Sequence, residues 1–143
     1  MNDNIKLDKV DLHIHTTASD GSCSPRELIK EVLKTKLKLI AITDHDTLDN
    51  VEETEKLALD SGLNFLKGVE ISSIFEGKLY HILAYGIQMK NIKLIELIKS
   101  NREILEKQDD DSIKLLIKQG FNLDLIEYKA YDHDIKRGGW KSL

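Results

Sequence analysis

Two histidines stand one residue apart near the start of the chain, His13 and His15, and an aspartate follows at Asp20. Imidazole and carboxylate groups are the usual protein ligands of Zn²⁺, Mn²⁺ and Fe²⁺. On a β-strand, residues two apart point to the same face, so His13 and His15 can reach one ion. Asp20, in the loop that follows, can reach a second ion. The alternative is an ordinary strand with a polar end, because an isolated His-x-His pair is a weak signal.

Further residues of the same types follow the later apolar segments: Asp44, His45, Asp46, Glu70 and His81. Each has an ordinary explanation by itself, since aspartates and histidines often cap helices and a lone glutamate usually lies on the surface. Their placement on successive predicted strands favours a metal site, because the C-terminal ends of parallel strands meet at one edge of a sheet. Glu70 has two oxygens and can bridge two ions. Without cations, such a cluster would leave desolvated charge unpaired.

The elements that must position these residues alternate along the chain. Residues 9–16 alternate apolar and polar side chains, which is typical of a strand with one buried face. Short apolar runs predict the remaining strands, and helical patterns separate the first three strands. The strands are expected at 9–16, 37–46, 63–72 and 78–87, and the helices from Pro25, over 47–62 and over 91–119. This order predicts an α/β fold with a mostly parallel sheet or a partial barrel.

Local signals predict where several elements begin and end. Ser24 and Glu27, with Pro25 between them, have the spacing of a capping box at a helix start. Thr47 is the expected N-cap of the second helix. Gly77 is the expected turn of a hairpin between the last two strands.

The C-terminal third has fewer signals for function. Three adjacent carboxylates, Asp109–Asp111, repel one another, so a bend or break is expected in the long helix there. A solvated acidic face explains them better than a cation site does. His133 has no strand before it and is interpreted as a surface histidine.

Composition limits the class of protein. The length of 143 residues suits one domain, and the net charge of −4 argues against binding an extended nucleic-acid tract, which needs a basic surface. The single cysteine, Cys23, cannot form a disulfide within the chain. The polar N-terminus lacks a signal-peptide pattern, and the apolar runs are too short to span a membrane. A cytoplasmic location without membrane contact is therefore expected.

Four ordered stretches, "DLHIHTTASDG", "ITDHDT", "GVEIS" and "YHILAYG", resemble the successive motifs of the PHP (polymerase and histidinol phosphatase) family. The resemblance covers roughly residues 9–90. It implies an α/β fold that is the N-terminal half of a distorted (β/α)7 PHP-type barrel, followed by a mainly helical C-terminal segment. It also implies a cluster of two or three divalent metal ions, Mn, Zn or Fe.

By motif matching, six side chains would bind these ions. The implied groups are His13 and His15 with Glu70, Asp20 with His45, and Glu70 with His81. Asp11 and Asp44 match family positions that serve either as structural partners or as carboxylates that orient imidazoles by accepting their second N–H.

The activity that the resemblance implies is metal-assisted phosphoester hydrolysis, in which the ions activate a water and neutralise phosphoryl oxygens. The expected substrate is a small phosphorylated molecule, such as a nucleoside 3',5'-bisphosphate or a short oligonucleotide. One alternative is a histidinol-phosphate phosphatase, which shares these motifs. Another is a non-catalytic metal-binding fragment that needs a complementary chain.

The resemblance also implies that complete PHP domains are longer, and that their later motifs supply another histidine and an Asp-x-His pair. Nothing after His81 matches those motifs, and "KRGGWKSL" (136–143) resembles a stretch within a helical insertion of relatives. We therefore expect one partial PHP domain over 1–143, with a βα core at 1–90 and an insertion-like helical segment at 91–143. Weak or absent activity of the isolated chain is expected, with a homo-oligomer or a complementing chain left open.

Overall fold

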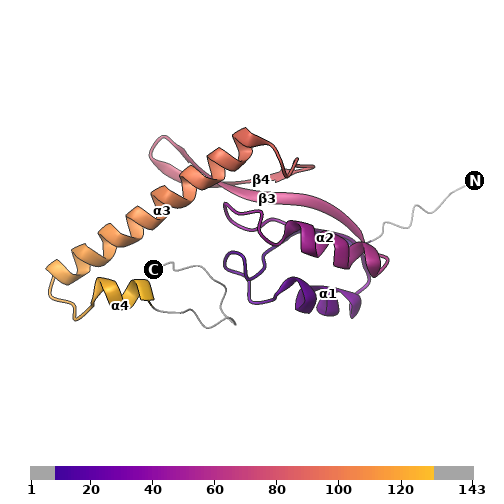
Figure 1. Ribbon diagram of the computed structural model, residues 1–143, viewed down its shortest axis with the longest axis horizontal. Helices are drawn as coiled ribbons and strands as arrows, with labels where there is room; N and C mark the ends of the chain where they lie inside the picture. Colours follow the sequence, from indigo (N-terminus) through magenta and orange to yellow (C-terminus); the bar gives the residue numbers. More distant parts are fainter. Residues whose placement is uncertain (1–8, 131–143) are drawn as a thin grey trace, which may run out of the picture.

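The computed structural model describes residues 9–130, and its centre is a four-stranded sheet. Strands β1 (Lys9–Ile14), β2 (Leu37–Ile42), β3 (Asn64–Phe75) and β4 (Lys78–Tyr85) are neighbours in chain order. The first three are parallel. Strand β4, which lies beside β3 in Figure 1, runs antiparallel to it. The predicted α/β class and mostly parallel sheet are therefore confirmed. The expectations for His133 and for 136–143 lie outside the described residues.

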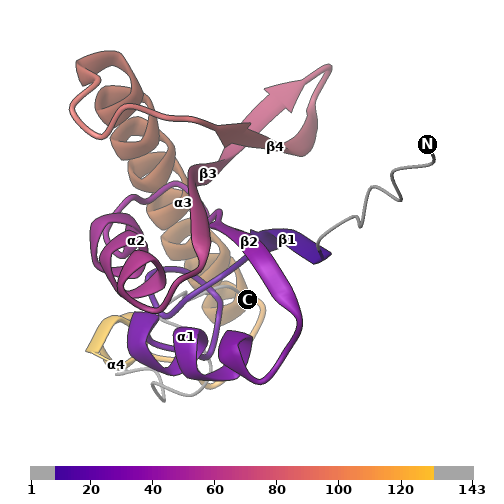
Figure 2. The same cartoon turned by 90° about the vertical axis from the view of Figure 1, so that its right-hand side faces the viewer.

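Helices α1 (Pro25–Leu33) and α2 (Val51–Asp60) connect the parallel strands and pack side by side (Figures 1 and 2). Their apolar faces meet β2 in the main core, which is aliphatic and contains Leu28, Ile29, Val32, Ile40, Ile42, Val51, Ala58 and Leu63. The capping box at the start of α1 is confirmed. The Ser24 side chain accepts from the backbone N–H of Glu27, and the Glu27 carboxylate accepts from the backbone N–H of Ser24.

The predicted start of the second helix is wrong. Helix α2 begins at Val51, with Asn50 rather than Thr47 in the cap position. The Asn50 side chain makes no cap hydrogen bond and instead donates to Thr16 Oγ1 at 2.8 Å. Residues 43–50 lie between β2 and α2 and bond to the neighbouring strands near the strand ends. They are therefore not part of the helix.

Strands β3 and β4 form a hairpin that extends away from α1 and α2 (Figure 2). Glu76 and Gly77 lie between them with positive φ angles of 49° and 74°, so the predicted turn at Gly77 is confirmed. Ser72 pairs with His81 across the hairpin. Because side chains alternate along a strand, Glu70 and Ser72 share one face of β3.

Helix α3 (Ile92–Lys118) is long and crosses the sheet beside β3, and the short helix α4 (Leu125–Ala130) follows it (Figure 1). The helix runs without interruption through Asp109–Asp111, so the predicted bend or break is absent there. Lys114 relieves part of the repulsion, with its Nζ 3.2 Å from Asp111 Oδ1. Within 9–130, no helix has the length and apolar character needed to cross a membrane.

Candidate metal centre

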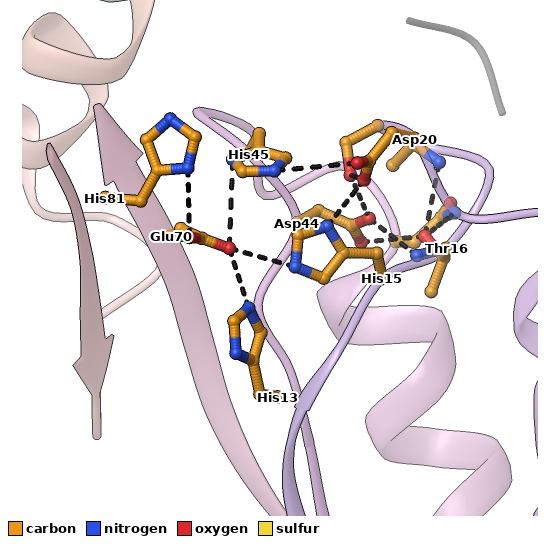
Figure 3. Close-up of polar contacts among 11 residues, drawn as sticks. His13, His15, Thr16, Asp20, Asp44, His45, Glu70 and His81 are labelled. Atoms are coloured by element: carbon orange, nitrogen blue, oxygen red, sulfur yellow. Dashed lines mark hydrogen bonds and ion pairs between the residues drawn. The ribbon is translucent and has the colours of Figure 1, made fainter. Parts of the chain in front are cut away.

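The carboxylate of Glu70 lies at the centre of the predicted site (Figure 3). Its side chain is only 6% exposed, yet imidazole nitrogens approach both of its oxygens. Oε2 lies 2.8 Å from His13 Nε2 and 2.9 Å from His15 Nε2, and Oε1 lies 3.3 Å from His81 Nδ1. His45 Nδ1 is 3.8 Å from Oε2. A buried carboxylate is therefore surrounded by nitrogen donors from β1, β4 and the turn after β2.

Asp20 supplies a second carboxylate beside this group. One of its oxygens is hydrogen bonded to His15 Nδ1, and the other lies 3.6 Å from His45 Nε2. The rings of His15 and His45 are 4.6 Å apart between centroids, and so are those of His45 and His81. The cluster is thus continuous from Asp20, through the histidines, to Glu70.

Backbone pairing explains how distant segments converge. Beyond the end of β1 and β2, the Thr43 N–H donates to Ile14 O at 2.8 Å. His45 then forms an isolated parallel bridge with Glu70, in which Glu70 N–H donates to Asp44 O and Asp46 N–H donates to Glu70 O. These bonds place His45 beside the middle of β3 rather than beyond its end.

Asp44 connects the two loops that carry Asp20 and His45. Its fully buried carboxylate accepts hydrogen bonds from the Thr16 N–H, the Thr16 hydroxyl and the Ser19 hydroxyl, each at 2.7 Å. Asp11 is exposed, and its carboxylate accepts from the backbone N–H of His13 at 3.2 Å. The structure therefore places Asp44 as an anchor of the loop after β1. The expected role of Asp11 and Asp44 in orienting imidazoles stays a prediction.

The electrostatic surroundings shift two pKa values in the cluster. Burial lowers the pKa of His45, although the negative charges of Glu70 and Asp20 oppose this shift. For Asp20, burial opposes ionisation, but the hydrogen bond with His15 and the neighbouring histidines hold its pKa below the ordinary value. A neutral imidazole and an ionised carboxylate are the forms that coordinate metal ions.

The donor set fits divalent metal ions. Three groups each bring their ligand atoms within 4.8 Å of one another: His13, His15 and Glu70; His15, Asp20 and His45; and His45, Glu70 and His81. All six expected ligands belong to at least one group, and nitrogen and carboxylate oxygen donors suit Zn²⁺, Mn²⁺ and Fe²⁺. Two carboxylates, of which one is buried, lie among the imidazole nitrogens. Their negative charge also favours the binding of cations.

Several residues around the cluster were missed by sequence reasoning. Thr16 and Ser19 lie inside "HTTASDG", so their closeness to expected ligands was a usable signal. Asn101 gave no local signal, because its partner Asp46 is 55 residues away.

Comparison with known proteins agrees with this geometry. The PHP domain family profile matches residues 11–134, and the chain belongs to the PHP domain family. Its curated relatives include a 5'-3' exoribonuclease of Haemophilus influenzae, 37% identical over 100 residues, which are 70% of this chain and 36% of that protein. Another is a 3',5'-nucleoside bisphosphate phosphatase of Chromobacterium violaceum, 36% identical over 94 residues, which are 66% of this chain and 33% of that protein.

A solved structure confirms the fold. An amidohydrolase from Chromobacterium violaceum, with bound sulfate and no metal, superposes with a TM-score of 0.76 and 28% identity. The superposition covers 90% of this chain and 45% of that one. The expected half of a PHP-type fold, followed by a helical segment, is therefore confirmed. The chain spans about a third of the length of the two curated relatives named above.

Proposed function

We propose that this chain carries the metal site of a metal-dependent phosphoesterase that acts on a nucleotide or short oligonucleotide, such as a nucleoside 3',5'-bisphosphate. The observation that carries the proposal is the buried Glu70 carboxylate, approached by nitrogens of four histidines from three parts of the fold. Such a cluster has no evident use in packing, because it removes charge from water within a small domain.

The six predicted ligands would hold two or three divalent ions. Bound there, such ions would supply an activated water and positive charge for the phosphoryl oxygens. The residues of the chain bind and position: Glu70 has one oxygen toward His13 and His15 and the other toward His81. The side chains of His13 and Asp20 are about half exposed, at 52% and 46%, which leaves this side of the cluster open to a substrate.

The substrate class rests on the relatives. Those compared above are named for a nucleoside bisphosphate and for RNA, and both names describe phosphoester cleavage in nucleotides. We extend this class to the present chain, together with the cytoplasmic location expected from its sequence. The division into a βα core at 1–90 and a helical segment at 91–143 within one partial domain is part of the same proposal.

The test measures metal binding and turnover separately. Metal-free protein is titrated with Mn²⁺ by calorimetry, and phosphate release is followed with nucleoside 3',5'-bisphosphate and with histidinol phosphate. We expect Mn²⁺ binding and weak phosphate release that prefers the bisphosphate. Glu70→Gln should abolish both, whereas Glu31→Gln, which alters an exposed carboxylate paired with Lys34, should change neither.

Other results of the same experiment would favour the alternatives. Preference for histidinol phosphate would favour a histidinol-phosphate phosphatase. Metal binding without turnover would favour a non-catalytic fragment that needs a complementing chain. Light scattering of the same sample decides whether the chain forms a homo-oligomer. The absence of both metal binding and turnover would refute the proposed function.

A further inference from the structure

The turn that carries His45 has an unusual backbone conformation. Asp46, the next residue, has a φ of 44°, in the left-handed region that residues with a β-carbon rarely adopt. The conformation lets the chain pass Glu70 with a hydrogen bond on each side, from Glu70 N–H to Asp44 O and from Asp46 N–H to Glu70 O. The position of the His45 imidazole beside Glu70 therefore depends on how firmly Asp46 is held.

Asp46 is held by its side chain. The residue is fully buried, and its Oδ1 accepts from the Ser72 N–H at 3.1 Å and from Asn101 Nδ2 at 2.7 Å. Its Oδ2 is buried without a hydrogen-bond partner among residues 9–130. No ion pair reaches this carboxylate from the part of the chain that the structure describes. Because a buried carboxylate is costly without hydrogen-bond donors, the two hydrogen bonds to Oδ1 are important for holding the Asp46 side chain in place.

Asn101 is the donor that comes from outside the sheet. It lies on α3, and its amide nitrogen also donates to Ser72 O at 2.8 Å. A primary amide has two N–H donors, and both are used here. One side chain thus joins α3, the backbone of β3 and the turn after β2.

Packing around this link is incomplete. An open cleft of about 490 Å³ separates α3 from the segment after β2, with Leu48, Met89 and Ile98 among its lining residues. At the cleft, Arg102 Nη1 lies 3.7 Å from Asp49 Oδ2, in a solvent-exposed pair that contributes little. The hydrogen bonds of Asn101 are therefore the main specific contact between the middle of α3 and this turn.

We propose that Asn101 is a positioning residue for the metal centre, which fixes Asp46 and thereby holds the His45 imidazole beside Glu70 and Asp20. The inference rests on the proposed function, because it concerns the same metal centre. It assigns to α3, which lies outside the recognised motifs, control over how well the site binds its ions. Residues that orient a metal ligand typically change affinity by 10–100-fold when removed.

The test compares Mn²⁺ affinity in the full chain by calorimetry. Asn101→Ala should raise the Kd for Mn²⁺ about tenfold. Asn101→Asp should do so at least as strongly, because it keeps the shape but places a carboxylate against Asp46. Asn91→Ala is the matched control: it removes an asparagine that caps the same helix through Leu94 N–H. Arg102→Ala is the second control, and both should leave the Kd within twofold.

A measurement on metal-free protein distinguishes a failure of this inference from a failure of the proposed function. Amide hydrogen exchange at Asp46, whose N–H bonds to Glu70 O, should accelerate in Asn101→Ala and stay unchanged in Arg102→Ala. Unchanged exchange and unchanged Kd in Asn101→Ala would overturn the inference and reduce Asn101 to a docking contact. Wild-type protein that binds no Mn²⁺ would overturn the proposed function, and the inference with it, whatever the exchange shows.

Discussion

Thr16 donates two hydrogen bonds to Asp44, one from its backbone N–H and one from its hydroxyl, both at 2.7 Å. The two residues are fully buried, although 28 positions separate them. This pair locks the loop after β1 to the turn after β2. The predicted ligands Asp20 and His45 lie on those two segments, so their separation depends on it.

Removing the hydroxyl of this pair should destabilise the fold. Thr16→Val keeps the shape but leaves Asp44 Oδ2 without this donor, and we expect a loss of about 1–3 kcal/mol in the free energy of unfolding. Urea unfolding of metal-free protein measures it. Thr54→Val is the matched control, because the Thr54 hydroxyl bonds to Asn50 O, which also accepts the Thr54 N–H. Equal losses in the two variants would contradict the anchoring role.

Gly21 should resist substitution because of close backbone approach. A β-carbon there would overlap the backbone of His15 and Thr16. We expect Gly21→Ala to cost about 1–3 kcal/mol as an overpacked site and to weaken Mn²⁺ binding, since Asp20 precedes it. Gly62→Ala is the control: it has open space but a φ of 76°, so it should cost about 1–2 kcal/mol without changing affinity. Unaltered Mn²⁺ affinity in Gly21→Ala would contradict this prediction.

Metal ions should stabilise the folded protein. Ligands that bind only the native state stabilise it by about 2.7 kcal/mol at a concentration of 100 times the Kd. We therefore expect Mn²⁺ to raise the thermal midpoint relative to protein in chelator. Asp20→Asn should shrink this rise, while Asp111→Asn, at an exposed carboxylate of α3, should preserve it. An equal rise in Asp20→Asn and the wild type would remove Asp20 from the ligand set.

The acidic run of α3 should affect stability in a pH-dependent way. Burial, together with the charges of Asp110 and Glu106, raises the pKa of Asp109. An acid whose pKa is raised on folding loses stability as the pH increases through that pKa. Asp109→Asn should therefore stabilise the protein at pH 7, by about 0.5 kcal/mol or less. The gain should vanish as the pH falls through the pKa of Asp109.

Thermal unfolding of the two proteins at several pH values measures this difference. Asp111→Asn serves as the control, because the Asp111 carboxylate lies 3.2 Å from Lys114 Nζ. It should give no gain at pH 7. A stabilisation by Asp109→Asn that persists unchanged at acidic pH would refute the electrostatic explanation.

The grouping of the expected ligands was predictable from sequence. His13 and His15 alternate with apolar residues, and a period of two predicts that they share one face of the chain at the end of β1. Parallel strands bring their C-terminal ends together, so polar residues after β1 and β2 had to meet. The capping box at Ser24 and the turn at Gly77 were equally local, and both are confirmed. That these residues bind metal remains a prediction for the experiments above.

Other features depended on contacts that local patterns do not contain. Thr47 has the residue type of an N-cap, yet the segment after β2 is drawn into hydrogen bonds with β3 and α2 starts later. Asp109–Asp111 repel one another, but Lys114 and the length of α3 keep the helix continuous. For α2 longer-range contacts outweighed the local preference, whereas for α3 a contact between residues three positions apart offset part of the repulsion.

The sequence alone determined the order of elements, the family and the set of side chains that could bind ions, because periodicity and motif spacing are local properties. Only the tertiary structure decided which atoms face one another, as in the pairs Glu70 with His13, Thr16 with Asp44 and Asn101 with Asp46. Those pairs join residues 28 to 57 positions apart in the chain. Their geometry follows from sheet register and helix docking, which depend on the packing of the whole chain.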